Sequence, residues 1–154
     1  SKTIDCVNHM LNNLETDEIK FDYIIILQPT SPLRTHNHIN QAIEMILTDK
    51  DADSLVSCVE VPHIFHPESV MVINNKKYLE PFLSKIKYST RRQDKSQVFS
   101  RNGASIYITK RNKICDYIYG GNLICYKMSL SDSVDIDNMN DFRIAEQKLN
   151  ARKN

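Results

Sequence analysis

Apolar residues recur at helical spacing near the start of the chain, at Ile4, Val7, Leu11 and Leu14. Positions three and four apart fall on one face of a helix, so this stretch predicts an amphipathic helix. A short apolar run rich in isoleucine, Tyr23–Leu27, follows it. A continuous run of this length is typical of a strand that is buried on both faces of a sheet.

A second helix and a second strand are predicted next. Thr35 is a suitable N-cap, because its hydroxyl can accept a hydrogen bond from a free backbone N–H of the first turn. The inward face of this helix is expected to consist of Ile39, Ala42, Ile43, Ile46 and Leu47. Ser54–Val59 then predicts a strand. A strand, a helix and a strand at this spacing form a parallel crossover, so we expect an α/β fold with a mostly parallel sheet flanked by helices.

The pattern changes after Pro62. Ser69–Ile73 and Lys77–Leu79 flank Asn74-Asn75-Lys76, a turn signal, and together they predict a hairpin. A polar, basic stretch without clear periodicity follows, from Pro81 to Gln97. The simplest organisation is one domain of residues 1–154 with an inserted hairpin and arm at about 62–97.

The last third of the chain is expected to rejoin the sheet and end in a helix. Ala104–Thr109 and Leu123–Met128 have the composition of strands. Asn140 is a suitable cap for the last helix. Its inward residues are expected to be Phe142, Ala145 and Leu149.

The composition fits one ordinary globular unit, since the 154 residues are 41% hydrophobic and 25% charged. A net charge of +1 provides no field to capture nucleic acid or an anionic membrane, so neither is expected as a partner. The longest apolar run, Tyr23–Leu27, is far too short to cross a membrane. The four cysteines form no CxxC pair, which argues against zinc and suits core residues of a protein in the reducing cytoplasm.

The chain has three glycines, Gly103, Gly120 and Gly121. A loop that cradles phosphates needs several glycines, so that backbone N–H groups can converge on the oxygen atoms. If the protein handles a nucleoside triphosphate, we expect the residues that grip the phosphates to lie outside this chain.

The first candidate site segment is Leu27–Arg34, which contains Gln28, Thr30 and Ser31. It follows the predicted Tyr23–Leu27 strand, and open α/β sheets bind ligands beyond the carboxyl ends of their strands. Pro29 and Pro32 stiffen the segment, which lowers the entropic cost of presenting its polar side chains. The structural alternative is a rigid crossover loop that only caps a helix.

The second candidate is the acidic stretch Ser133–Asp137. In an extended segment residues two apart point the same way, so Asp135 and Asp137 can present two carboxylates together. Two hard oxygen ligands, with room for water and phosphate, are what Mg²⁺ accepts. The alternative is a solvated acidic turn ahead of a helix.

The third candidate lies in the arm, at Arg92 and Gln93, and leads to Asn102 and Gly103. An arginine fork matches the geometry of carboxylate or phosphate in a way that lysine does not. Gly103 lets the backbone approach a ligand or turn. The alternative is a solvated basic loop.

Taken together and in order, these segments resemble the acylneuraminate cytidylyltransferase family, the CMP–N-acetylneuraminic acid synthetases. Leu27–Arg34 reads LQPTSPLR, Arg92-Gln93 followed by Asn102-Gly103-Ala104 and Tyr107 resembles an RQ…NGA-x-Y segment, and Ser133–Asp137 with Asp141 resembles an S-x-DID-x-x-x-D ending. The resemblance runs from about Thr3 to the last predicted helix.

The resemblance implies a reaction in which CTP and a nonulosonic, sialic-acid-like sugar acid give the CMP-sugar and pyrophosphate, for cell-surface glycan synthesis. It implies a Rossmann-like nucleotidyltransferase core, Mg²⁺ at Asp135 and Asp137, and a cytoplasmic homodimer whose arm packs on the partner. It also implies a sugar contact by Gln28, and Thr30 and Ser31 of the same loop are further candidates for substrate binding. By the same resemblance, Arg92 and Gln93 reach the substrate, Arg92 with a catalytic role, and Thr3 lies near the cytosine. Asn102 matches the asparagine of the family's NGA segment, and we expect it and Gly103 to bind the substrate.

The chain also departs from the family's pattern. The family begins with a strand and an R-x-G-S-K-type loop that holds the triphosphate, and neither is present among these residues. We therefore expect an N-terminally incomplete core that is inactive alone. Two other classes stay open: a non-catalytic sugar-binding or dimerisation module, and a nucleotide-sugar glycosyltransferase that uses the Asp-x-Asp pair.

Overall fold

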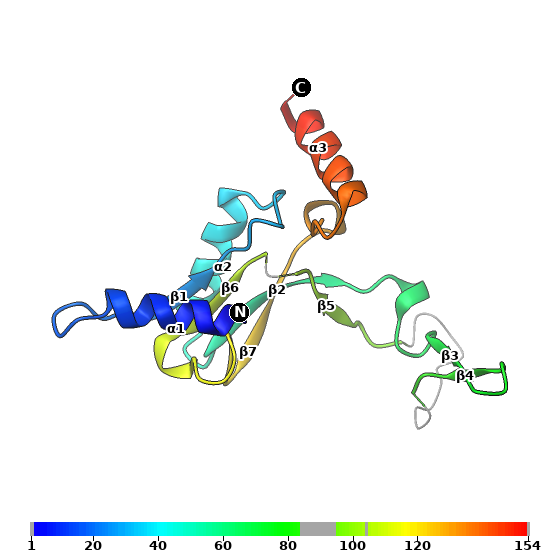
Figure 1. Ribbon diagram of the computed structural model, residues 1–154, viewed down its shortest axis with the longest axis horizontal. Helices are drawn as coiled ribbons and strands as arrows, with labels where there is room; N and C mark the ends of the chain where they lie inside the picture. The colour runs from blue at the N-terminus through cyan, green and yellow to red at the C-terminus, as the bar shows by residue number, and fades with distance from the viewer. Residues whose placement is uncertain (1, 84–94, 104, 154) are drawn as a thin grey trace. The chain divides into compact units, whose positions relative to one another are not determined.

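The structure is a computed structural model that describes residues 2–83, 95–103 and 105–153. The chain forms two compact units, one of Ser1–Val59 with Arg101–Asn154 and the other of Glu60–Ser100. The first unit contains helices α1 (Thr3–Leu14), α2 (His36–Thr48) and α3 (Met139–Lys153) (Figure 1). None of the described helices is long and apolar enough to cross a membrane.

One mixed sheet organises the first unit. Its strands are β1 (Tyr23–Ile26), β2 (Ser54–Glu60), β5 (Phe99–Arg101), β6 (Tyr107–Lys110) and β7 (Leu123–Lys127). The order is β1-β6-β2-β5, and β7 also pairs with β2.

The predicted α/β fold is confirmed, but the sheet is mixed rather than mostly parallel. β1 and β2 run the same way, but β6 lies between them and pairs antiparallel with both. β7 pairs with β2 in parallel. β6 follows the second unit and β5 in the chain and returns antiparallel to β2.

β1 corrects the prediction of a strand that is buried on both faces. Within the part of the chain that the structure describes, β1 pairs with β6 alone, so its other edge is unpaired. Ile25 is 40% exposed, and the flanking Leu27 is 38% exposed. The apolar run arises at a sheet edge rather than at the centre of a sheet.

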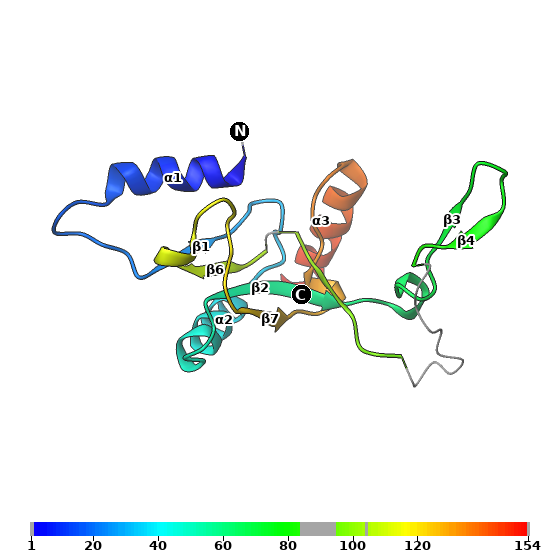
Figure 2. The ribbon, with the colours of Figure 1, turned by 90° about the horizontal axis from the view of Figure 1, so that it is seen from below.

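The hydrophobic core has two layers, one on each face of the sheet. α2 contributes Ala42 and Ile46 to a cluster with Leu55 of β2 and Ile108 of β6. α1 contributes Ile4 to the second cluster, which contains residues of the opposite face of the strands. Figure 2 shows α1 and α2 on opposite sides of the strands.

Several predicted inward residues are exposed. Leu14 and Leu47, each in the last turn of its helix, are 48% and 59% exposed. Phe142 is 48% exposed, whereas Ala145 is buried as predicted. Cys58 is the cysteine that lies in the core, whereas Cys6 and Cys115 are exposed, which corrects the expectation of core cysteines.

The helix caps follow the predicted chemistry, with one shift in position. Thr35 accepts a hydrogen bond from the His38 backbone N–H at its hydroxyl, as predicted. α3 begins at Met139, so Asn140 lies inside the helix rather than at its cap. Asn138 takes that role, since its side-chain oxygen accepts from the backbone N–H groups of Asn140 and Asp141.

The predicted hairpin is present in the second unit. β3 (Met71–Ile73) and β4 (Leu79–Pro81) pair antiparallel, with Ile73 opposite Leu79. The Asn74 side chain accepts hydrogen bonds from the backbone N–H groups of Lys76 and Tyr78, and Lys77 adopts a φ of 66°. These bonds close the turn, which therefore extends two residues further than the sequence indicated.

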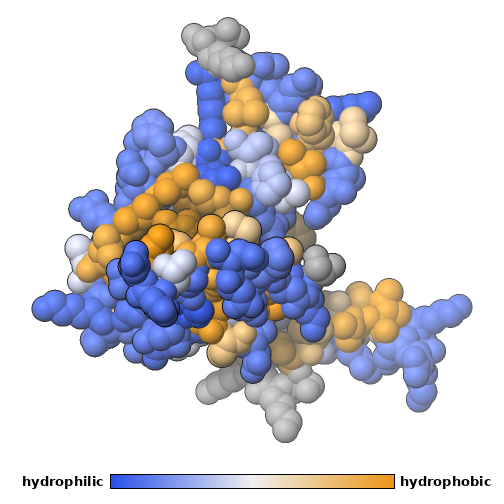
Figure 3. Space-filling view, turned by 60° about the vertical axis from the view of Figure 1, so that its left-hand side comes forward, coloured by the Kyte–Doolittle hydropathy of each residue, from blue (hydrophilic) through white to orange (hydrophobic). Residues whose placement is uncertain are grey.

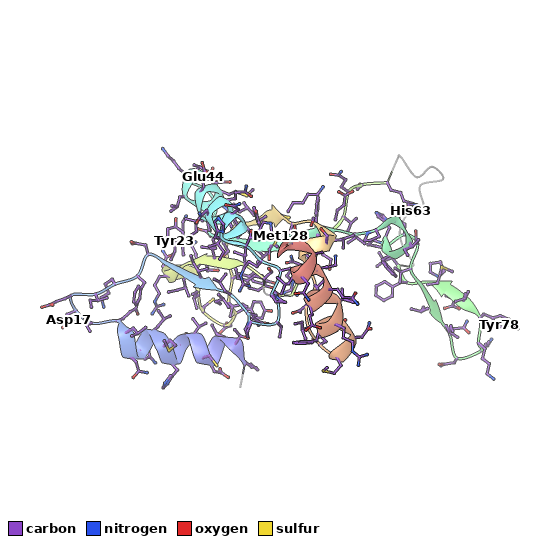
Figure 4. All side chains as sticks on the ribbon, turned by 90° about the horizontal axis from the view of Figure 1, so that it is seen from above. Asp17, Tyr23, Glu44, His63, Tyr78 and Met128 are labelled. Atoms are coloured by element: carbon purple, nitrogen blue, oxygen red, sulfur yellow. The ribbon has the colours of Figure 1, made fainter. Side chains whose placement is uncertain are left out.

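A broad apolar surface lies beside β1 in the first unit. A groove of about 480 Å³ runs between α1 and β1 and is lined by residues such as Met10, Leu14 and Ile25. Figure 3 brings this side of the molecule forward and shows apolar side chains gathered there. Figure 4 labels Tyr23 of β1, which also lines the groove.

Candidate active site

Three predicted segments meet at one edge of the sheet. Residues 27–34 follow the carboxyl end of β1, residues 102–105 precede the start of β6, and residues 133–137 follow β7. The strand register places Ile26 of β1 and Val56 of β2 opposite Tyr107, the first residue of β6. All three segments therefore lie where the parallel strands end, which is the usual ligand-binding edge of an α/β sheet.

Direct contacts join these segments. The backbone N–H of Ile136 donates to the Thr30 carbonyl oxygen at 2.8 Å, which ties the acidic segment to the loop after β1. The Asn102 side-chain amide donates to the Ser133 hydroxyl at 2.8 Å. The sequence separation of these partners is large, so the fold itself assembles the cluster.

Gly103 allows the closest approach in the cluster. It adopts a φ of +72°, and a Cβ atom placed on it would lie 2.8 Å from the Asp135 side-chain carbon Cγ. That distance is too short for any real side chain, so only glycine leaves room for the Asp135 carboxylate here. Gly103 and Asp135, which were predicted independently, are therefore immediate neighbours.

Arg34 holds the loop after β1 in place, a role that no sequence pattern indicated. Its Nη1 atom donates to the carbonyl oxygens of Gln28, at 3.1 Å, and Ser105, at 2.7 Å. Partial burial lowers the pKa of the Arg34 guanidinium. Arginine nevertheless keeps its charge at neutral pH, so the clamp persists.

Asn102 is buried and its side chain is fully engaged. Its Oδ1 atom accepts from the Ser57 hydroxyl at 2.7 Å, and its Nδ2 atom donates to Ser133 and contacts the Met128 sulfur at 3.4 Å. The Ser57 hydroxyl also accepts from the Ile106 backbone N–H. In this arrangement Asn102 joins β2 to the acidic segment. β6 begins at Tyr107, and Ala104, the first residue of the predicted strand, lies outside the described residues.

Three buried side-chain oxygens lack a hydrogen-bond partner among the described residues: Ser31 Oγ, Ser105 Oγ and Asp135 Oδ1. One lies in each of the three segments that meet at this edge. A buried polar atom without a partner is costly, and natural proteins keep few of them without a ligand, an ion or water to satisfy them. These three oxygens are therefore the polar groups of the cluster whose hydrogen-bonding capacity the described residues leave unused, and no sequence pattern had indicated Ser105.

The remaining predicted site residues lie at varied positions. Gln28 and Thr30 are half-buried in the loop after β1. Asp137 is exposed, and its backbone N–H donates to the Asp141 carboxylate at 3.2 Å. Thr3 lies in the first turn of α1 and lines the same groove as Leu27, the residue before Gln28. Arg92 and Gln93 lie outside the described residues.

Arg101 lies against aromatic rings. Its Nη1 atom donates to the Tyr117 hydroxyl at 3.3 Å, and its guanidinium carbon is 5.6 Å from the centre of the Tyr119 ring. The hydrogen bond with Tyr117 raises the pKa of Arg101. These contacts give Arg101 a packing role on the loop between β6 and β7.

Comparison with known proteins identifies relatives over most of the chain. An N-acylneuraminate cytidylyltransferase of Streptococcus agalactiae serotype III is 30% identical over 134 residues, which are 86% of this chain and 32% of that protein. N-acylneuraminate cytidylyltransferase A of Danio rerio is 34% identical over 129 residues, 83% of this chain and 29% of that protein. The chain is a relative of the N-acylneuraminate cytidylyltransferases. It spans about a third of their length.

Other comparisons extend this result. The post-translational flagellin modification protein B of Campylobacter coli is 30% identical over 140 residues, 89% of this chain and 57% of that protein. A solved structure of CMP:2-keto-3-deoxy-manno-octonic acid synthetase complexed with CTP is similar to this chain, with a TM-score of 0.62 and 15% identity. The match covers 100% of this chain and 70% of the synthetase chain. The chain therefore has a nucleotidyltransferase fold. No protein-family profile matches it.

A divalent cation fits the chemistry of this edge. Asp135 offers a buried carboxylate oxygen without a partner in the described part of the chain, and Mg²⁺ prefers such oxygens. Three converging His, Cys, Asp or Glu side chains are not found in the ranges that the structure covers. Asp135 would contribute this oxygen to the ion, and phosphate and water oxygens would complete the coordination, as is usual for Mg²⁺.

Proposed function

We propose that the protein transfers CMP from CTP to a nonulosonic, sialic-acid-like acid and releases pyrophosphate. The observation that supports this proposal is that hydrogen bonds join the loop after β1, Asn102 and the acidic segment at the carboxyl end of the parallel strands, in a relative of the cytidylyltransferases. We further propose a cytoplasmic location, where CTP is available.

The proposed chemistry assigns a different task to each segment. The anomeric hydroxyl oxygen of the sugar acid forms a bond to the α-phosphorus of CTP, the hydroxyl proton passes to solvent, and the bond from that phosphorus to the departing pyrophosphate oxygen breaks. A bound Mg²⁺ neutralises charge on the phosphates. Asp135 and Asp137 would hold the ion, while Gln28, Thr30 and Ser31 would orient the sugar acid. Arg92, Gln93 and Thr3 remain proposed contacts to substrate and nucleotide.

Positioning residues keep these groups in register. Arg34 fixes the Gln28 backbone against Ser105, and Asn102 fixes Ser133 against β2. Gly103 keeps the space beside the Asp135 carboxylate open. Because misplacement of reacting groups by about 1 Å can cost about a hundredfold in rate, these contacts belong to the function as well as to the fold.

The test is pyrophosphate release by the complete protein with CTP, Mg²⁺ and either N-acetylneuraminic acid or 2-keto-3-deoxy-octonic acid. We expect release with the nonulosonic acid and formation of its CMP-sugar. Residues 1–154 alone are expected to give little or none, because the phosphate-gripping glycine loop is absent from them. Release with neither acid, from a folded complete protein that binds CTP, would contradict the proposal.

We also propose that the second unit mediates dimerisation. Its hairpin exposes Ile73 (71%), Tyr78 (68%) and Leu79 (65%), and Phe82 beyond it is 60% exposed. A two-stranded hairpin buries too little surface to be stable by itself, and an exposed apolar cluster of this kind marks an interaction site. The apolar residues of this unit therefore fit a second copy of the chain.

Charged substitutions on this hairpin should dissociate the dimer. Ile73→Asp combined with Leu79→Asp places two carboxylates opposite each other on the strand pair, and the complete protein should become a monomer by light scattering. Lys76→Ser, at the exposed turn of the same hairpin, is the matched control and should remain a dimer. If the double variant stays dimeric, the hairpin is not the dimer interface.

A further inference from the structure

Helix α3 carries an arginine that reaches both site loops. The Nη1 atom of Arg152 donates to the carbonyl oxygen of Leu33 at 2.9 Å, in the loop after β1. Its Nη2 atom donates to the carboxylate of Asp132, which precedes the acidic segment. Arg152 and Leu33 are separated by 119 positions in the sequence, so this bridge exists only in the folded chain.

Asp132 is the centre of a small polar network rather than a free acidic group. Its Oδ2 atom accepts from the Ser129 hydroxyl at 2.8 Å and lies 3.7 Å from His38 Nε2 on α2. Its backbone N–H donates to the Ser129 hydroxyl. Asp132 is therefore committed to these partners, which separates its role from that of Asp135, three residues later.

We infer that Arg152 is a positioning residue that fixes the distance between the loop carrying Gln28, Thr30 and Ser31 and the segment carrying Asp135. The expected effect of Arg152 on the rate rests on the proposed function, whereas its structural role does not. The planar guanidinium fork donates in two directions at once, and the backbone bond from Ile136 to Thr30 is then the second tie between the same two segments. Two ties at different points prevent the segments from rotating past each other.

The conservative variant Arg152→Lys separates positioning from simple stabilisation. Lysine keeps the charge, so an ion pair with Asp132 persists, but a single ammonium group does not reproduce the planar fork that reaches Leu33 as well. We therefore expect the thermal midpoint of Arg152→Lys to stay within about 2 °C of the parent. Its kcat should fall by about tenfold or more, with little change in the KM for CTP.

Lys148 provides a matched control on the same helix. Its ammonium group donates to the Ser131 carbonyl oxygen at 3.1 Å, so it touches the acidic side without touching the loop after β1. Lys148→Ala should leave kcat unchanged. Equal losses in Lys148→Ala and Arg152→Lys would mean that any weakening of α3 reduces activity, which would overturn the positioning role.

Hydrogen exchange supplies a readout that does not depend on catalysis. In Arg152→Lys and Arg152→Ala, peptides covering residues 28–34 and 130–137 should exchange faster than in the parent, while Lys148→Ala should match the parent at residues 28–34. Unchanged exchange at residues 28–34 in both Arg152 variants would refute the bridge. If the parent lacks cytidylyl transfer but the exchange result holds, the proposed function fails while the positioning role stands.

Discussion

Asp135→Asn in the complete protein is expected to abolish most CMP-sugar synthesis while leaving the fold intact. An amide coordinates Mg²⁺ more weakly than a carboxylate and leaves phosphate charge uncompensated, so we expect a loss of about a hundredfold or more in kcat. Folding should survive, because Asp135 Oδ1 has no hydrogen-bond partner among the described residues to lose. Pyrophosphate release and thermal melting measure the two effects separately.

Ligand-dependent melting sharpens this test. Mg²⁺ with CTP should raise the melting temperature of the parent, because a ligand that binds the native state stabilises it, and should raise that of Asp135→Asn little. Asp137→Asn is expected to behave similarly, although Asp137 is exposed. Asp116→Asn, at an exposed aspartate outside the three segments, is the matched control. If both site variants keep normal turnover and normal ligand stabilisation, Asp135 and Asp137 do not bind the metal and belong only to a solvated acidic turn.

Gly103→Ala is expected to have the second large effect. The added methyl group would overlap the Asp135 carboxylate and force it aside, and a side chain at a φ of +72° costs about 1–2 kcal/mol in backbone strain. We expect a lower thermal midpoint together with a loss of about a hundredfold in kcat, since displaced site groups are costly to the rate.

Gly121→Ala separates the loss of stability from the loss of function. Gly121 also has a positive φ, of +67°, and an added Cβ atom would overlap the carboxylate of Asp53. Asp53 precedes β2, at the opposite end of the sheet from Asp135, where it pairs with Lys110 and Lys113. This variant should lose comparable stability and keep its kcat. If the two glycine variants lose activity equally, the effect of Gly103→Ala is one of folding alone.

The sequence predicted the helices and the principal strands because periodicity and caps are local signals. Thr35 and the spacing of Ala42 and Ile46 describe α2 correctly, since one face of that helix packs on the sheet. The exposure of Leu47 was not predictable from the helix alone, because burial depends on what packs against each position in the folded chain. β5 was missed because Phe99–Arg101 is too short to carry a period and forms by pairing with β2.

The candidate site was predicted only in part, because local patterns can be recognised in the sequence and long-range contacts cannot. Gln28, Gly103 and Asp135 stand in segments with recognisable local patterns, and the strand register brings those segments together. The hydrogen bond between Arg34 and Ser105 has no local signal, because it spans 71 positions. Burial without a partner, as at Ser31 and Ser105, appears only when every neighbour in space is known.

The unpaired edge of β1 has a consequence for handling these residues by themselves. An exposed row of backbone N–H and C=O groups beside apolar side chains such as Ile25 and Leu27 is a template on which another strand can assemble. Natural sheets usually protect such edges with charges, prolines or a covering segment, and Tyr23–Ile26 has neither charge nor proline. Residues 1–154 in isolation should therefore have limited colloidal stability, with association that grows with concentration and proceeds by sheet extension from one molecule to the next.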